Sequence, residues 1–341
     1  MELGSVRALK AEVEERVVRP FVAEALASGR IGMAARSLAT ATRRQPGIAL
    51  GVTRGRGKGD FRLAIRIQRP ALVGPELVGR IAEMAGGEHD LRVIGRVRKR
   101  AAAPRPWHQS RQRPLLLGSS IGHVDVTAGT LGAVAWHRRT DQAVVLSNNH
   151  VLANEDRGGA GDPILQPGAA DGGRRPGAVV GRLLAAVPLR RNGGNRVDAA
   201  IGELDDRIRF DPRTLTGLGA LAGVRAEPLL PGDRVAKVGR TTGLTRGRVS
   251  AVEVDGVVVG FETGDLSFDG QIEVEGEGGR PFSAGGDSGS LIVDADLRAC
   301  GLLFAGSDRG GSRGLGLTFV NEIAPVLRGL GLSLDLAPAM A

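Results

Sequence analysis

The chain has 341 residues, 42% apolar and 24% charged, which predicts two domains, or one large domain with an appendage, and excludes wholesale disorder. Its 53 glycines and 3% aromatic residues favour a turn-rich β protein, and its single cysteine, Cys300, excludes an internal disulfide. The net charge is +9, but residues 1–115 hold 23 basic and 10 acidic residues (+13), whereas residues 116–341 hold 23 and 27 (−4).

Residues 1–45 are predicted to form an N-terminal helical segment. Apolar side chains recur at helical spacing within residues 5–19, namely at Val6, Leu9, Val13 and Val17. Pro20 is expected to interrupt this pattern. An amphipathic helix of this kind needs an apolar surface to pack against, either in another domain or in a second copy of the chain, so a homo-oligomer is one expectation.

Residues 46–99 are predicted to form a small basic α+β domain with the element order β-β-α-β. Strands are expected at 48–52, 61–67 and 91–97, and a helix at 75–86. The Gly-rich segment between the first two strands lacks the spacing and the following helix of a phosphate-binding loop. We interpret it as a hairpin turn.

Residues 100–117 are predicted to be a basic, Pro-containing linker. Arg92 to Arg113 holds eight basic and no acidic residues, a pattern typical of contacts to a polyanion such as a nucleic acid. The Ala and Pro residues around it and the scarcity of aromatic side chains for stacking on bases favour a solvated linker instead.

The remaining residues, 118–341, show many short apolar runs separated by Gly-rich turns. They include TLGAVAW, AVVLSN, VDAAIGEL, RVAKVGR, GRVSAVEV, GVVVGF, QIEVE, SLIVDA and ACGLLFAG. Regular short strands with few helices indicate a β-barrel or a sandwich, and about 200 residues suffice for two barrels. A last amphipathic run, NEIAPVLRGLGLSL, is expected to be a closing helix.

Leader sequences, membrane spans and metal sites are not predicted. The first residues have no apolar core of a signal peptide, and no stretch reaches the ~20 apolar residues of a membrane span, so a cytoplasmic protein is expected. The candidate ligands lack metal-ligand spacing, so neither a metal nor a cofactor is expected. These residues are His123, Asp125, His137, Asp141 and Cys300.

Three local sequences carry the chemistry of residues 118–341: LSNNHVLA around His150, RVDAAIGEL around Asp198 and FSAGGDSGSLIV around Ser288. A serine hydroxyl is a weak nucleophile that needs a base within hydrogen-bonding reach, and a neutral histidine can accept its proton. A carboxylate on the other ring nitrogen fixes the tautomer and stabilises the imidazolium. The order His, Asp, Ser is that of the chymotrypsin triad.

The glycines beside Ser288 have a separate task. A tight GGDSG turn can direct the N–H groups of Gly286 and Ser288 at one point, where a carbonyl oxygen becomes negative during acyl transfer. A Cβ at Gly286 could obstruct this backbone conformation. We therefore expect Gly286 and Ser288 to form an oxyanion hole.

These segments resemble a trypsin-like serine endopeptidase of the chymotrypsin fold, from about Gly118 to Leu334. More narrowly, SNNHVLANE, GDPILQPG, GRTTGLTRG and PFSAGGDSGSLI resemble a bacterial intracellular group related to the plant Narrow-leaf trypsin-like proteins. The resemblance implies a mainly β, chymotrypsin-like double β-barrel, here preceded by the amphipathic helix and the β-β-α-β domain. It further implies a protein or peptide substrate cleaved by a His150–Asp198–Ser288 triad.

The sequence departs from secreted members of this family. Asn148 and Asn149 precede His150 where a small pair is usual, and no activation cleavage site is evident. In zymogen-type relatives, the aspartate that matches Asp287 pairs with a newly made N-terminus. Asp287 must find another partner, since a buried unpaired charge is unfavourable. GRTTGLTRG is interpreted as a hairpin of the barrel framework.

The resemblance also implies where a substrate side chain would bind. The pocket is expected to be walled by Phe282, six residues before Ser288, and by Leu303, Phe304 and Ala305 on the following strand. None of these residues is charged, so cleavage after small or medium apolar residues is expected. The alternative function is an interaction or scaffold protein on a protease fold, with little proteolysis or with proteolysis only of itself.

Overall fold

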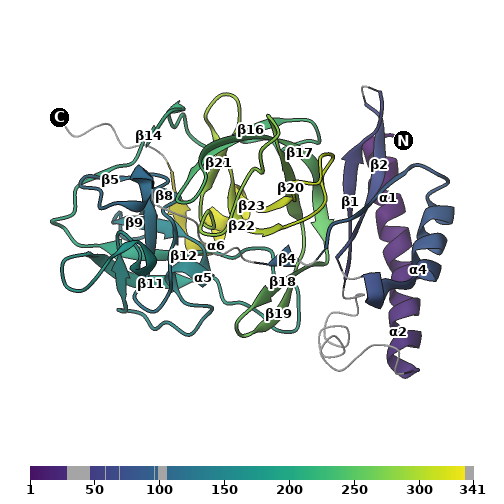
Figure 1. The fold of residues 1–341 in the computed structure, drawn as a ribbon, viewed down its shortest axis with the longest axis horizontal. Helices are drawn as coiled ribbons and strands as arrows, with labels where there is room; N and C mark the ends of the chain where they lie inside the picture. Colours follow the sequence, from purple (N-terminus) through teal and green to yellow (C-terminus); the bar gives the residue numbers. More distant parts are fainter. Residues whose placement is uncertain (29–46, 58, 69, 96, 99–105, 335–341) are drawn as a thin grey trace.

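The computed structural model describes residues 1–28, 47–57, 59–68, 70–95, 97–98 and 106–334. In these ranges the protein is mainly β, and Figure 1 shows a smaller unit of strands and helices beside a larger β-rich body. The expected double β-barrel with an N-terminal α+β unit is confirmed. Residues 29–45 of the predicted helical segment, residues 99–105 at the start of the predicted linker, and residues 335–341 lie outside the described ranges. The domain boundaries stay predictions.

The N-terminal helix continues past Pro20 instead of being interrupted there. α1 (Leu3–Val13) leads through a π-helical turn (Glu14–Val18) into α2 (Arg19–Ala27). Proline has no N–H for the carbonyl four residues earlier and its ring crowds that carbonyl. The π-helical turn, in which the N–H of Arg19 bonds to the carbonyl of Glu14, widens the helix just before the proline.

The expected β-β-α-β order follows these helices. β1 (Ile48–Arg54) and β2 (Phe61–Ile67) form an antiparallel hairpin, as the turn between them predicted. α4 (Pro70–Met84), bent at Gly74, returns the chain so that β3 (His89–Val93) lies parallel to β2. The apolar faces of the helices and the sheet form one core cluster.

The strand expected at 91–97 is two strands. β3 ends at Val93, the chain turns at Gly95 with φ of +68°, and β4 (Val97–Arg98) lies in a different part of the molecule. β4 pairs with strands of the second barrel rather than with β2. A glycine fits this turn because its left-handed φ is unfavourable for other residues.

The N-terminal sheet joins the second barrel directly. β1 pairs antiparallel with β17 (Gly243–Asp255). Across this junction, the buried guanidinium of Arg66 on β2 forms a two-point ion pair with Glu273, with N–O distances of 2.8 and 3.0 Å, and bonds to Asp90 as well. The two units therefore share both hydrogen bonds and a buried charge pair.

The first barrel is an open sheet in which each strand neighbours the next in the order β24-β8-β9-β12-β11-β10-β6-β7. Its strands are β6 (Ser120–His123), β7 (Gly129–Thr130), β8 (Ala133–His137), β9 (Ala143–Ser147), β10 (Pro163–Leu165), β11 (Val179–Ala186), β12 (Ala200–Leu204) and β24 (Leu332–Ser333).

The second barrel closes on itself through the pairings β16-β17-β20-β23-β22-β21-β16. Besides β17, its strands are β16 (Arg234–Gly239), β20 (Gln271–Gly276), β21 (Leu291–Val293), β22 (Ala299–Ser307) and β23 (Thr318–Glu322). The hairpin of β18 (Val257–Phe261) and β19 (Gly264–Phe268) extends this sheet.

Short elements connect the two barrels. β5 (Leu115–Leu116) pairs with β13 (Phe210–Asp211), and β14 (Thr214–Leu215) pairs with β15 (Gly219–Ala220). After β23, the expected closing helix is α6 (Ile323–Leu330), and β24 then pairs with β8 of the first barrel. The C-terminal segment thus ties the second barrel back to the first.

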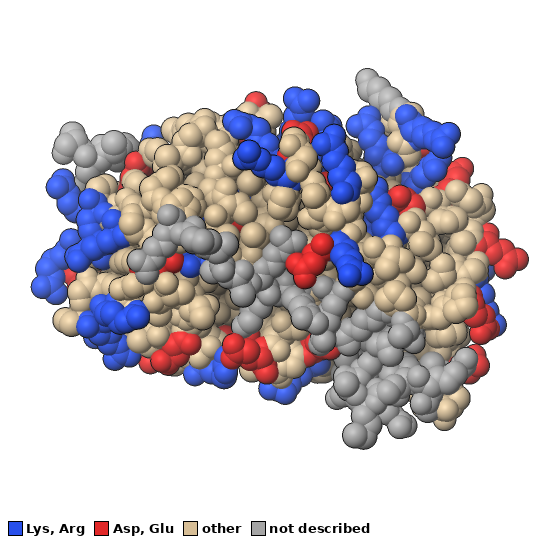
Figure 2. Space-filling view, in the orientation of Figure 1, with Lys and Arg blue, Asp and Glu red and all other residues tan. Residues whose placement is uncertain are grey.

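Positive charge is spread over separate places on the surface. On the face drawn in Figure 2, Lys and Arg side chains form several groups, with acidic side chains beside some of them. Arg92, in the basic stretch, pairs with Asp90 at 2.9 Å and also contacts Glu275, and Arg113 bonds to Gln166 at 2.6 Å. Internal partners therefore engage part of this basic stretch.

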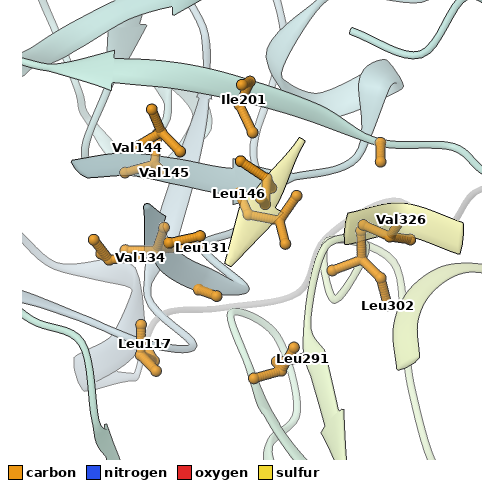
Figure 3. Packing of buried hydrophobic residues seen from close by; sticks show 14 of the residues in the cluster. Leu117, Leu131, Val134, Val144, Val145, Leu146, Ile201, Leu291, Leu302 and Val326 are labelled. Carbon is orange, nitrogen blue, oxygen red and sulfur yellow. The ribbon is translucent and has the colours of Figure 1, made fainter. Parts of the chain in front are cut away.

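One apolar cluster fills the space where the barrels meet (Figure 3). Leu131 and Leu146 come from the first barrel, Leu291 and Leu302 from the second, and Val326 from α6. These side chains are almost fully removed from solvent. The cluster fixes the relative position of the loops that cross between the barrels.

Replacing Leu302 by Ala is expected to lower the free energy of unfolding by about 2–5 kcal/mol, because it leaves a cavity between the barrels. The matched change Leu230→Ala, at a side chain that is 40% exposed, should have an effect of about 0.5 kcal/mol or less. Denaturant unfolding of both variants measures the difference. Similar losses for the two would contradict the packing described here.

Candidate active site

His150 lies in a single helical turn directly after β9. The chain leaves β9 at Ser147, passes Asn148 in an extended conformation and enters α5 (Asn149–Leu152). The apolar run of β9 is buried in the first barrel, so this turn is held against the core. The side chain of His150 is only 6% exposed.

Strand pairing brings Asp198 to His150. β12 runs antiparallel to β9 with Ala200 opposite Ser147, so residues just before β12 lie beside those just after β9. The Asp198 Oδ2 lies 2.5 Å from Nδ1 of His150, and its Oδ1 accepts the main-chain N–H of His150 at 3.2 Å. A bond at Nδ1 leaves Nε2 of the neutral ring as the proton acceptor.

Two asparagines hold the main chain of Asp198. Asn148 donates from Nδ2 to the carbonyl of Asp198 at 2.7 Å, and Asn321 on β23 accepts the N–H of Asp198 at 2.9 Å. Asn149 bonds instead to the carbonyl of Val187. Of the Asn pair before His150, Asn148 therefore supports the site directly. Asn321 is a contribution of the second barrel that its sequence context does not reveal.

Ser288 lies in the loop between β20 and β21, in a turn that requires glycine. Gly286 and Gly289 have φ of +93° and +94°. A Cβ at Gly286 would lie 2.5 Å from Nη1 of Arg240, which is too close without a rearrangement. Thr130 of the first barrel binds this turn twice, through its hydroxyl to the carbonyl of Gly286 and through its N–H to that of Ser288, both at 2.8 Å.

The two N–H groups expected to form the oxyanion hole are available. Within the described ranges, neither the N–H of Gly286 nor that of Ser288 donates to a protein acceptor, whereas the N–H of Asp287, between them, bonds to Ala284. Unpaired N–H groups next to a serine hydroxyl form the arrangement that stabilises a developing oxyanion.

The hydroxyl of Ser288 points at β22 in this structure. It donates to the carbonyl of Phe304 at 3.4 Å, and among the described residues no hydrogen bond joins it to His150. The ring of His150 packs edge-on against Phe261, with centroids 5.9 Å apart. The structure thus brings His150 and Asp198 into direct contact but does not pair His150 with Ser288.

Asp287 finds the partner that the sequence left open. Its fully buried carboxylate lies 3.1 Å from Nζ of Lys237, which is also fully buried, on β16. It also accepts N–H groups of Thr241 at 2.8 Å and of Ala284 at 2.9 Å, and the hydroxyl of Thr242 at 2.7 Å. The GRTTG turn is therefore both the expected hairpin and the cradle for this carboxylate.

These contacts determine the charge state of Asp287. Burial by itself raises the pKa of this carboxyl, but the ammonium of Lys237 and the surrounding donors outweigh that effect and hold the pKa below its usual value. A signal for Lys237 was present in the sequence: it is one of four lysines and stands within an apolar strand.

The residues expected to wall a substrate pocket are all buried. Phe282 and Leu303 belong to one core cluster, while Phe304 and Ala305 belong to another, together with Phe268. A cavity of about 570 Å³ borders Pro281, next to Phe282, and its lining includes Thr242, Arg246 and Glu277. The pocket assignment therefore stays a prediction.

Other expected features concern metals, membranes and the cysteine. In the described ranges no three His, Cys, Asp or Glu residues are placed to hold a metal ion. No helix there has the length and apolar character to cross a bilayer. Cys300 is buried, and its burial raises the pKa of the thiol.

Replacing Lys237 by Met is expected to lower the free energy of unfolding by about 3–5 kcal/mol near neutral pH, because Asp287 would stay buried without its cation. In the wild type, the depressed pKa of Asp287 contributes stability above the pKa of the unfolded chain, about 4, and this stability is lost as pH falls through the folded pKa. In the variant the pKa rises, so protonation relieves the unpaired charge and the deficit shrinks in mild acid.

Denaturant unfolding at about pH 7 and about pH 4.5 measures this dependence. Lys10→Met is the matched control, because Lys10 pairs with a partly exposed Asp255 and its loss should change stability by about 1 kcal/mol or less. Equal deficits for Lys237→Met at both pH values would contradict the assigned role.

Family models and curated proteins give no match to this chain. Among solved structures, Thermobifida fusca protease A is similar at 18% identity and a TM-score of 0.44, over 64% of this chain and 97% of that one. A glutamic acid-specific serine protease is similar at 20% identity and 0.46, over 64% and 99%. An α-lytic protease homologue, N4, is similar at 22% identity and 0.44, over 65% and 99%.

Proposed function

We propose that the protein is a serine endopeptidase that hydrolyses peptide bonds through His150, Asp198 and Ser288. The observation that carries the proposal is the buried Asp198–His150 hydrogen bond, 2.5 Å long. Beside it, the Ser288 turn holds two N–H groups that donate to no acceptor among the described residues. A base oriented by a carboxylate, together with a serine beside free N–H groups, supports acyl transfer.

In the first half of the proposed reaction, Oγ of Ser288 attacks the carbonyl carbon of the scissile peptide bond. Nε2 of His150 accepts the hydroxyl proton, and Asp198 stabilises the resulting imidazolium. The carbonyl oxygen, now negative, accepts hydrogen bonds from the N–H groups of Gly286 and Ser288. When the C–N bond breaks, the imidazolium gives its proton to the leaving amine, and an ester of Ser288 remains.

In the second half, a water molecule attacks this ester. His150 takes a proton from the water, the same N–H groups hold the second oxyanion, and the proton returns to Oγ as the carboxylic acid product leaves. Before the first half can begin, the hydrogen bond from the Ser288 hydroxyl to the carbonyl of Phe304 must break. This requires rotation about one bond of the Ser288 side chain.

The setting of this activity is part of the proposal. We infer a cytoplasmic enzyme of the bacterial intracellular group that the sequence resembles. Its single cysteine is buried and free, and a fold that is stable without disulfides suits a reducing compartment. The basic N-terminal unit would then act on substrate access or on assembly into an oligomer. Its direct pairing with β17 supports a role that is coupled to the second barrel.

Substitution of Ser288 by Ala or of His150 by Ala is expected to reduce kcat for peptide or ester hydrolysis by a factor on the order of 10⁶. Asp198→Asn should reduce it by about 10⁴, because the ring would be held in the wrong tautomer. Steady-state assays and labelling of Ser288 by a fluorophosphonate probe measure these losses. Ser110→Ala and His137→Ala, at residues outside the site, are the controls and should keep wild-type rates.

A folded wild-type protein that is not labelled at Ser288 would overturn the enzymatic proposal. It would favour the alternative function, an interaction protein on a protease fold. Wild-type turnover in Ser288→Ala or His150→Ala would overturn the assignment of the triad itself.

For specificity, cleavage is expected after Ala, Val or Leu rather than after Lys or Arg. Phe282, Leu303, Phe304 and Ala305 offer no carboxylate to a basic side chain, whereas burial of an apolar side chain gains about 25 cal/mol per Å². Digestion of a mixed peptide library, followed by mass spectrometry of the new C-termini, measures the preference. A dominant preference for Lys or Arg would contradict the apolar pocket.

A further inference from the structure

The two-residue strand β4 lies between two strands of the second barrel. Arg98 is paired with Gly306 of β22 in antiparallel register and with Gly260 of β18 in parallel register, and Val97 is paired with Ser307. The segment that leaves the N-terminal unit therefore forms an inner strand of the sheet, hydrogen-bonded on both sides (Figure 1).

Both neighbours of β4 contact the candidate catalytic residues. On β22, the carbonyl of Phe304, two residues before Gly306, accepts the hydroxyl of Ser288. On β18, Phe261, next to Gly260, packs against the ring of His150. β4 thus occupies the gap between the strand that touches the nucleophile and the strand that touches the base.

Along one edge of β22, three segments form backbone hydrogen bonds one after another, and β4 is the last of them. On this edge, opposite the one taken by β23, Leu291 of β21 pairs with Leu302, the N–H of Gly289 bonds to the carbonyl of Leu303, and Arg98 pairs with Gly306. An extended peptide with its scissile bond at Ser288 would meet the same backbone groups of β22. β4 also runs in the direction of a peptide that approaches Ser288 along this edge from its N-terminal side. Its second residue, Arg98, lies nearer to Phe304 than its first residue, Val97, does.

Apolar burial anchors the segment in this place. Val97 is 1% exposed and Ile94 is fully buried, and both belong to the core cluster that contains Phe304 and Ala305. Removing these apolar side chains from water stabilises the segment in this position. The segment is therefore held by side-chain burial as well as by backbone pairing.

We propose that β4 is the chain's own occupant of the peptide-binding edge of β22, so that the intact protein is held in a self-blocked state. The ligand class for this edge is an extended peptide that pairs with Gly306 and Ser307 and places an apolar side chain where Val97 lies. Such a peptide binds only in molecules from which β4 has withdrawn. This inference rests on the proposed function for its catalytic consequence, but not for the binding event.

The test compares two substitutions in the full chain. Val97→Asp places a charge in the buried cluster and should release β4, whereas Val93→Asp makes the same change on β3 at a side chain that is 54% exposed. The first readout is the rate of fluorophosphonate labelling at Ser288. The second is binding of a fluorescent peptide with the sequence Ile-Gly-Arg-Val-Arg, that of residues 94–98, in a Ser288→Ala background.

Val97→Asp is expected to raise the labelling rate and the peptide affinity about tenfold or more, because apparent affinity scales with the fraction of molecules whose edge is open. Val93→Asp should match the wild type in both readouts. Should Val97→Asp fail to fold by circular dichroism, Val97→Gly, which removes the buried side chain without adding charge, is measured in the same way.

Equal peptide affinities in the wild type, the Val93 variant and the released Val97 variant would overturn the self-blocked state, whatever the labelling rate. Tighter peptide binding by the Val97 variant without labelling of Ser288 in any variant would support β4 as the occupant and overturn the proposed hydrolysis. The two failures are therefore distinguishable.

Discussion

The buried carboxylate of Asp287 is the constraint on which the Ser288 turn depends. A charge inside the barrel is tolerated only with a compensating cation and a full set of donors, and Lys237 with the GRTTG turn provides both. Satisfying Asp287 fixes the residues on either side of it, and the N–H groups of Gly286 and Ser288 are left without a protein acceptor in the part of the chain that the structure describes. The cation is a side chain of the same barrel, so the turn takes this form in the uncut chain.

The candidate site depends on hydrogen bonds that run between the two barrels. His150 and Asp198 come from the first barrel and Ser288 from the second, yet each half is tied to the other. Asn321 of the second barrel holds the main chain of Asp198, and Thr130 of the first holds the Ser288 turn. A shift between the barrels would therefore strain these hydrogen bonds at the same time as it changed the distance between His150 and Ser288.

Local pattern was enough to predict the strands that form apolar runs, such as β8, β9 and β22, and the two hairpin turns. The His150, Asp198 and Ser288 segments are each contiguous in sequence, so these residues could be named as catalytic candidates. The continuation of the first helix past Pro20 was not predictable from the rule that proline interrupts helices, because a π-helical turn just before the proline keeps the helix continuous. Lys237 and Asn321 were missed because their partners are distant in sequence. The separate strand at Val97 was missed for the same reason: its pairing is set by the barrel.

The return of β24 to β8 has a consequence for biosynthesis. Trp136 and His137 pair with Ser333 and Leu332, so β8, which already pairs with β9, gains its second partner only after the residues between 137 and 332 have been synthesised. At 5–20 residues per second, synthesis of these intervening residues takes about 10–40 s. The main-chain N–H of Asp198 likewise gains its acceptor, the side chain of Asn321, only after residue 321 has been synthesised. The first barrel of a nascent polypeptide would thus stay open at one edge until Leu332 and Ser333 have been made, and the candidate site would lack the Asn321 contact until β23 has been made.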